Sequence, residues 1–161
     1  MLPRWAGYGN LTARMKVEGI NQIGVVVRDV EAAARFLHEK LGMGPFGILE
    51  LNEATARYRD QDIRYRLKVG LCGLGPITLE LIQVVEGHPI LKDYLPASGQ
   101  GVHHLGIYVD DLDAAVAEWQ AQGHRLLQRG SFMPGGGSAY LDTPDPAGIL
   151  IELIQFPKGK S

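Results

Sequence analysis

The sequence predicts an α+β fold built from two tandem βαβββ modules, whose curled mixed sheets surround a concave cup. Three observations lead to this prediction: an internal repeat, a capped amphipathic helix in each copy, and three strand-like runs after each helix. We expect the modules at residues 20–85 and 102–156, joined by a connector at 86–101. With an N-terminal arm at 1–19 and a tail at 157–161, the chain should form one structural domain.

The repeat is visible directly in the sequence. The segment "INQIGVVVRDVEAAARFL" at 20–37 aligns without gaps with "VHHLGIYVDDLDAAVAEW" at 102–119. Gly24 aligns with Gly106, and most other pairs exchange similar residues. Each copy begins with a β-branched run typical of a strand and continues into a helical pattern.

Each expected helix has a start signal, an apolar stripe and a stop signal. Asp29 and Asp111 occupy the N-cap positions, where a carboxylate accepts from free backbone N–H groups. Gly42 and Gly123 follow the last turns, where a left-handed backbone is favourable. The stripes consist of Val30, Ala34, Leu37 and Leu41 in the first helix and of Leu112, Ala115, Val116 and Trp119 in the second.

Three strand-like runs follow each helix. They are expected at 46–51, 63–69 and 77–84 in the first module and at 124–129, 138–142 and 149–154 in the second. The connector contains Pro89, Pro96 and Gly99, so we expect a loop or a short helix there. Two four-stranded sheets leave exposed edges, which predicts a homodimer.

Composition narrows the possible partners. The 161 residues carry a formal net charge of −2, which gives no basic surface for nucleic acid or an anionic membrane. We find no signal peptide and no apolar run long enough to span a membrane. Cys72 is the single cysteine, so no internal disulfide forms. We therefore expect a cytoplasmic protein with a small-molecule ligand.

Four polar residues stand at equivalent places in the repeat. The sequence "ELIQ" occurs twice, with Glu80 and Glu152 in the last expected strand of each module. Gln22 aligns with His104 in the first strands. Since side chains alternate across a strand, all four point away from the helices and into the cup.

A divalent cation accounts for this set. Two buried carboxylates are costly without an opposite charge, and an imidazole nitrogen with an amide oxygen completes a mixed set of four ligands. We expect one ion, Zn²⁺, Co²⁺, Ni²⁺ or Mn²⁺, held by Gln22, Glu80, His104 and Glu152. The other histidines are interpreted as structural or surface residues; they are His38, His88, His103 and His124.

These residues resemble the vicinal oxygen chelate superfamily, which includes glyoxalase I, bleomycin-binding proteins and extradiol dioxygenases. The resemblance covers 20 to about 158. Its metal ligands fall on the same four positions. Within the superfamily, "GHPILKDYLPASGQGVHHLGIYVDDLDAA" and "GILIELIQFPK" resemble methylmalonyl-CoA epimerases in order and spacing. Those epimerases carry His where this chain has Gln22, and a glutamate base where it has Tyr65.

The resemblance implies an enzyme, a metal-dependent isomerase that removes a proton α to a carbonyl through a metal-bound enediolate. Glu152 is the expected base, with Glu80 opposite and Tyr65 donating a hydrogen bond to the developing oxyanion. The substrate should chelate through two adjacent oxygens, as an acyl-CoA thioester or a hemithioacetal does. The glycine-rich run "SFMPGGGS" is interpreted as a closing loop or a plain hairpin.

Alternatives remain at this point. A lactoylglutathione lyase of the glyoxalase I type shares the Gln, Glu, His, Glu ligand set, whereas the glutathione-contacting stretch is not matched by "ELIQVVEG". An iron dioxygenase needs a second histidine at Gln22. A metal-free binding protein of the resistance type would use the same cup to hold a ligand, although such proteins tend to lack the ligand set.

Overall fold

The computed structural model describes residues 17–87 and 89–158. Most of the expected arm, the end of the tail and His88 lie outside these residues. Eight strands form one closed sheet in the order β1-β4-β3-β2-β6-β7-β8-β5. The strands are β1 (Gln22–Val26), β2 (Gly47–Tyr58), β3 (Gln61–Leu74), β4 (Ile77–Glu86), β5 (Gly101–Tyr108), β6 (Leu126–Met133), β7 (Gly136–Leu141) and β8 (Leu150–Gln155).

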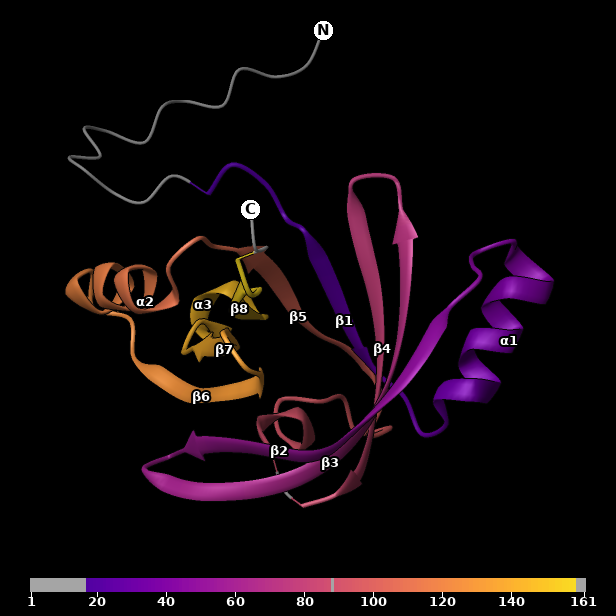
Figure 1. Ribbon diagram of the computed structural model, residues 1–161, viewed down its shortest axis with the longest axis horizontal. Helices are drawn as coiled ribbons and strands as arrows, with labels where there is room; N and C mark the ends of the chain where they lie inside the picture. Colours follow the sequence, from indigo (N-terminus) through magenta and orange to yellow (C-terminus); the bar gives the residue numbers. More distant parts are fainter. Residues whose placement is uncertain (1–16, 88, 159–161) are drawn as a thin grey trace, which may run out of the picture.

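Two helices flank the curled sheet from opposite ends, as Figure 1 shows. They are α1 (Val30–Leu41) and α2 (Leu112–Ala121). A 3₁₀ turn, η1 (Ile90–Lys92), occupies the connector, and a single turn, α3 (Pro144–Ala147), precedes β8. The α+β class and the order βαβββ in each module are as predicted. Among the described residues, no helix has the length and apolar character to cross a membrane.

The helix signals in the sequence act as expected. The side chains of Asp29 and Asp111 accept from backbone N–H groups three residues on, each at 2.9 Å. Gly42 ends α1 in a left-handed conformation with φ 68°. In α1 the stripe buries Val30 and Ala34, whereas Leu41 at the last position is exposed. The caps thus fix where each helix starts, and the stripes fix the face that packs on the sheet.

Several strands are longer than expected, with β3 reaching Leu74 and β6 reaching Met133, and the strands differ from the prediction in two further ways. First, β2 continues seven residues beyond Leu51 to Tyr58, because its outer half pairs with β6 as well as with β3. Second, this β2–β6 pairing and the β1–β5 pairing join the two modules into one closed sheet, so the expectation of two separate sheets was wrong. The free edges that predicted a homodimer are therefore paired within the chain, and the dimer stays a prediction.

Three apolar clusters hold these layers together. One lies inside the closed sheet around Val69, Ile82 and Leu91. A second lies under α2 around Val116 and Leu153, and a third lies under α1. One face of the strands therefore points into the interior, and the other face packs under a helix in β4, β7 and β8 but is largely exposed in β2, as alternation allows. The four predicted ligands share the interior face with the first cluster.

Candidate metal centre

Four neighbouring strands each supply one of the predicted ligands. In the sheet, β4 lies beside β1, β1 beside β5, and β5 beside β8. The ligands in that order are Glu80, Gln22, His104 and Glu152. The structure thus brings together all four side chains that the repeat singled out, around the junction of the two modules.

Two glycines make room for these side chains. Gly24 pairs with Glu80 on one side and with His104 on the other. Gly106 lies in the same way between Gln22 and Glu152. A Cβ atom at Gly24 would fall 2.0 Å from the His104 ring, and one at Gly106 would fall 2.8 Å from the Cβ of Gln22. His104 therefore lies in the space left by Gly24 of the first module, and Gln22 lies in the space left by Gly106 of the second.

The donor atoms are close together. His104 Nε2 lies 3.0 Å from Oε2 of Glu152 and 3.6 Å from Oε2 of Glu80. Gln22 Nε2 donates to the same Glu80 oxygen at 2.5 Å. Gln22, His104 and Glu152 are buried, and the Glu80 side chain is 18% exposed toward the cup. One ligand atom from each of Glu80, His104 and Glu152 lies within 4.8 Å of the others.

Strand alternation pointed His103 away from the cup, but the structure places its ring against His104 and Tyr140. Gly24 pairs with His104 but Val25 pairs with Val102, so His103 is an extra residue at a β-bulge. A bulge interrupts alternation and redirects a side chain. His103 is buried, and its Nδ1 lies 3.1 Å from Nδ1 of His104. The adjacent pair of histidines was the only sequence signal for this arrangement.

The histidine pair fixes the direction of the hydrogen bonds. His103 Nε2 lies 3.1 Å from the Ile90 carbonyl oxygen, which can only accept, so this nitrogen carries the proton. Burial lowers the pKa of His103 to about 4, and the charge of the neighbouring His104 adds to this effect. The His103 ring is therefore neutral. Its Nδ1 therefore accepts from Nδ1–H of His104. This leaves Nε2 of His104 directed at the two carboxylates.

A metal ion fits these residues. Although His104 Nε2 approaches both carboxylates, it forms no hydrogen bond of suitable direction, and its atom is fully buried. A buried nitrogen without a directed partner is costly unless something else binds it. Convergence of a nitrogen and two carboxylate oxygens is typical of ligands for Zn²⁺ and similar ions. The Gln22 side chain can add an amide oxygen after rotation.

Two residues that the sequence analysis missed surround Glu152. The side chains of Ser138 and Tyr140 line the cavity beside it, and both lower the pKa of Glu152. The Tyr140 ring also makes edge contacts with His103 and His104, at centroid distances of 5.9 and 5.3 Å. Both residues alternate with Ala139 and Leu141, which are buried under α2, so alternation along β7 was the signal that pointed them inward.

Burial and the neighbouring groups give Glu80 and Glu152 different pKa values. Burial raises the pKa of Glu80, and the charge of Glu152 adds to this effect. Burial acts on Glu152 too, but His104, Ser138 and Tyr140 outweigh it and lower the pKa of Glu152. Burial also disfavours the charged form of His104, yet both carboxylates overcome it and raise its pKa to about 10. Glu152 is thus the better stabilised anion.

Tyr65 lies where strand alternation predicted it. It lines the same cavity as Gln22, Glu80 and Glu152, on the β3 wall. Burial, with a smaller effect of the Glu152 charge, raises the pKa of Tyr65 to about 12. The phenol therefore stays protonated near neutral pH and can donate a hydrogen bond but not act as a base.

The glycine-rich run forms a tight hairpin. β6 ends at Met133 and β7 begins at Gly136, with Gly135 in a left-handed conformation at φ 76°. Phe132 and Met133, just before the turn, line the cavity. Of the two interpretations of this run, the structure supports the plain hairpin.

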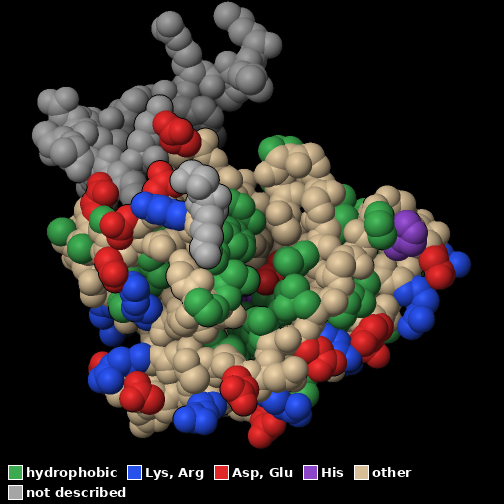
Figure 2. All heavy atoms as spheres, viewed as in Figure 1, with side chains coloured by type: hydrophobic (Ala, Val, Ile, Leu, Met, Phe, Trp, Pro, Cys, Tyr) green, Lys and Arg blue, Asp and Glu red, His purple; other side chains and the backbone are tan. Residues whose placement is uncertain are grey.

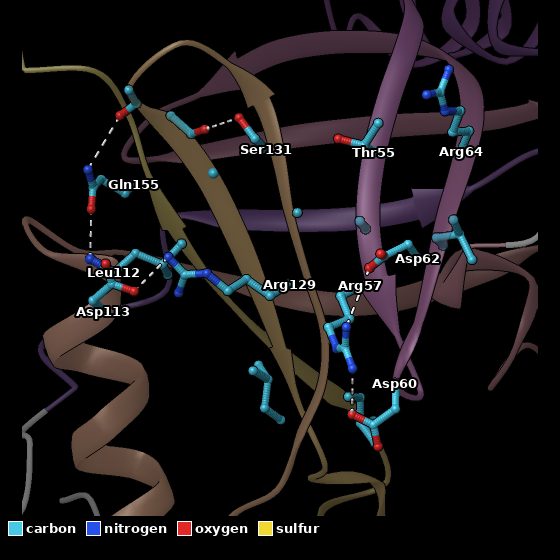
Figure 3. A pocket seen from close by; sticks show the side chains of 18 of the residues that line it. Thr55, Arg57, Asp60, Asp62, Arg64, Leu112, Asp113, Arg129, Ser131 and Gln155 are labelled. Carbon is cyan, nitrogen blue, oxygen red and sulfur yellow. Dashed lines mark hydrogen bonds and ion pairs between the residues drawn. The ribbon is translucent and has the colours of Figure 1, made fainter.

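A larger hollow of about 950 Å³ lies apart from the ligands, between α2, β2 and β6 (Figure 3). Two of its arginines have acidic partners: Arg57 lies 3.6 Å from Asp62, and Arg129 lies 2.7 Å from Asp113. None of the four predicted ligands lines it. Size alone therefore does not identify the site in this protein.

Comparisons with known proteins agree with this geometry. Residues 21–141 match the model of the glyoxalase/bleomycin resistance protein/dioxygenase superfamily. A 2-epi-5-epi-valiolone epimerase from an Actinomyces species is 30% identical over 149 residues, covering 87% of this chain and 80% of its own. The mitochondrial methylmalonyl-CoA epimerase of Homo sapiens is 28% identical over 145 residues, covering 84% and 73%.

A solved structure supports the fold. The methylmalonyl-CoA epimerase of Mycobacterium tuberculosis superposes with a TM-score of 0.62 at 24% identity, covering 94% of this chain and 95% of its own. The two relatives named above are epimerases, in agreement with the expected enzyme of the isomerase class. On the match over most of its length, the chain belongs to the glyoxalase/bleomycin resistance protein/dioxygenase superfamily.

Proposed function

We propose that this protein is a divalent-metal-dependent epimerase that inverts a carbon α to a carbonyl group. The observation that carries the proposal is the convergence of Glu80 and Glu152 on Nε2 of His104, a buried atom with no directed hydrogen bond. The epimerase relatives support the reaction class. They favour it over the lyase considered from the sequence.

Gln22, Glu80, His104 and Glu152 would hold the ion. When bound, a divalent cation acts as a Lewis acid that stabilises negative charge on the substrate oxygens. The two carboxylates balance its charge, and the buried position excludes most of the water that would screen it. His103 accepts from Nδ1–H of His104, so that Nε2 is the nitrogen that would give up its proton to bind the ion.

Epimerisation requires a group that removes the proton on one face and a group that returns it on the other. Glu152 and Glu80 come from the outer two of the four adjacent strands and lie on either side of His104. Glu152 is the base, because its lowered pKa keeps it ionised. Glu80 is its partner on the opposite face, and either carboxylate would loosen from the ion when it takes up the proton. Tyr65 donates to the oxygen where negative charge develops.

The substrate chelates through two oxygens and is a 2-substituted acyl-CoA thioester. The names of the mitochondrial relatives support this thioester class over a hemithioacetal. Tyr65 stands at the place where the sequence comparison expects a glutamate base, which requires Glu152 to take that role here.

Metal content tests the first half of the proposal. Untagged protein, purified without chelator, should carry about one divalent ion per chain by elemental analysis. Glu80→Ala and Glu152→Ala should lose the ion, whereas Glu86→Ala, at an exposed carboxylate on the same strand as Glu80, should keep it. Protein that takes up no ion even when metals are added contradicts the metal site and favours a ligand-binding cup.

Proton exchange tests the second half. Metal-loaded protein in ²H₂O should introduce deuterium at C2 of a 2-substituted acyl-CoA, measured by NMR, and the same protein treated with chelator should not. Glu152→Gln should lower the exchange rate by about 100-fold or more, the size of effect typical for removal of a general base. Exchange that is independent of metal would contradict the mechanism.

A further inference from the structure

A cavity of about 440 Å³ opens directly from the candidate metal centre. Gln22, Glu80 and Glu152 form its polar end. Beyond that end the walls are largely apolar and come from β2 and β3 on one side and from β6 and the end of β8 on the other. Figure 2 shows hydrophobic side chains gathered around a central hollow, with charged side chains around its outer margin.

The cavity carries no cationic side chain among the described residues that line it. Lys68 and Arg66 stand on β3, but they belong to the other face, where they pair with Glu31 at 2.7 Å and with Glu86 at 2.9 Å. A carboxylate or phosphate deep in the cavity, away from the ion, would lose its hydration without gaining an opposite charge. The cavity therefore selects against a ligand whose inner part carries a second anionic group.

The mouth of the cavity exposes large apolar side chains. Leu49, Met133 and Phe156 line it and are 40%, 42% and 46% exposed. The Phe156 ring packs edge-on against Tyr108 and Phe132, at centroid distances of 5.0 and 5.8 Å. An apolar ligand would cover these side chains on both sides of the mouth, and their burial would favour binding.

We propose that the substrate carries, beside its two chelating oxygens, an uncharged apolar group much larger than a methyl group. The inference rests on the proposed metal-dependent function. A cavity of this volume falls in the range of about 300–1,000 Å³ that binds drug-sized ligands, and a methyl group would contact little of its apolar wall. A medium-length or branched alkyl chain, or an aromatic ring, matches the size, shape and lack of cationic partners.

Hydroxamic acids test this directly, because they chelate divalent ions through two adjacent oxygens. Binding to the full-length Zn²⁺-loaded protein would be measured by calorimetry for acetohydroxamate, hexanohydroxamate and octanohydroxamate. Suberic acid monohydroxamate has the length of the last probe but ends in a carboxylate. We expect affinity to rise about fourfold for each methylene that is buried, and by about 100-fold or more across the series. The carboxylate-terminated probe should gain little over acetohydroxamate.

Substitutions at the mouth sharpen the test. Leu49→Ala and Phe156→Ala should each weaken octanohydroxamate binding by about 5- to 20-fold and leave acetohydroxamate within about twofold. Leu41→Ala is the matched control, since Leu41 is 60% exposed on α1 and does not line the cavity. It should change neither affinity. None of these three residues belongs to the proposed ligand set.

The outcomes separate the inference from the function on which it rests. If acetohydroxamate does not bind in a metal-dependent way, the proposed metal centre is wrong and the inference falls with it. If acetohydroxamate binds but affinity stays flat along the series, or the carboxylate-terminated probe binds as well as octanohydroxamate, the apolar substrate is overturned while the metal centre stands. A rising series that Leu49→Ala and Phe156→Ala flatten supports both.

Discussion

Nδ1 of His103 lies 3.1 Å from Nδ1 of His104, and this contact sets the protonation of both rings. Because His103 Nε2 donates to the Ile90 carbonyl, His103 Nδ1 is left as an acceptor, and His104 must turn its protonated Nδ1 toward it. The Ile90 carbonyl in the connector therefore determines, through His103, which nitrogen of His104 faces the two carboxylates.

Replacing His103 with Phe should weaken metal binding by about 10- to 100-fold, the effect typical of losing a hydrogen-bond partner to a ligating histidine. The ring contact with Tyr140 is kept, so the loss reports on the hydrogen bond rather than on packing. Competition with a chromophoric chelator measures the affinity. His38→Phe, at an exposed position on α1, is the control. Equal affinity in both variants would show that His103 does not orient His104.

Tyr140→Phe should weaken metal binding about 10-fold, because it removes the hydroxyl that helps to keep Glu152 ionised while leaving the ring against both histidines. The pKa of Glu152 should rise as well, so the loss should grow as the pH falls. Tyr58→Phe is a matched control, since its hydroxyl bonds Asp93 outside the site. A loss that does not depend on pH would contradict this role.

Gly24→Ala should abolish metal binding, because its Cβ would overlap the His104 ring, which has no space to move within the closed sheet. We expect a destabilisation of about 1–3 kcal/mol, as for other overpacking changes. Gly47→Ala, at a strand position where the new Cβ meets only a carbonyl oxygen at 4.0 Å, should keep the metal. Metal content and urea unfolding measure the two effects. Full metal occupancy in Gly24→Ala would show that the His104 ring can be displaced without cost.

The pH dependence of stability should differ between metal-free and metal-loaded protein. The folded-state pKa of His104, about 10, is above its ordinary value of 6.5, so its pairing with the carboxylates stabilises the metal-free fold fully below about pH 6.5. That stabilisation declines above this pH and is lost once the pH passes about 10.

Thermal unfolding between about pH 6.5 and 10 would measure this difference. The metal-free protein should lose stability more steeply than the metal-loaded protein, in which the ion takes the place of the proton on His104. Parallel curves would contradict the predicted ionisation of His104. Calorimetry at about pH 7 should correspondingly record the release of about one proton for each ion bound.

Much of this arrangement could be predicted from the sequence, because repeat symmetry and strand alternation are local. Together they placed Gln22, Glu80, His104 and Glu152 on the interior face. The features that could not be predicted depend on pairing between strands that are distant in sequence. The outer half of β2 contains Ala54 and Ala56, which are weak strand formers, and it extends because β6 pairs with it. The bulge at His103 arises where β5 meets β1 and has no local signature.

His104 packs over Gly24 and Gln22 packs over Gly106, so the backbone at the centre of the cup repeats itself across β1 and β5. The side chains do not repeat, because an amide stands in one module where an imidazole stands in the other. The two faces of a ligand held at this centre would therefore meet different chemical groups, although the strands that present them are alike.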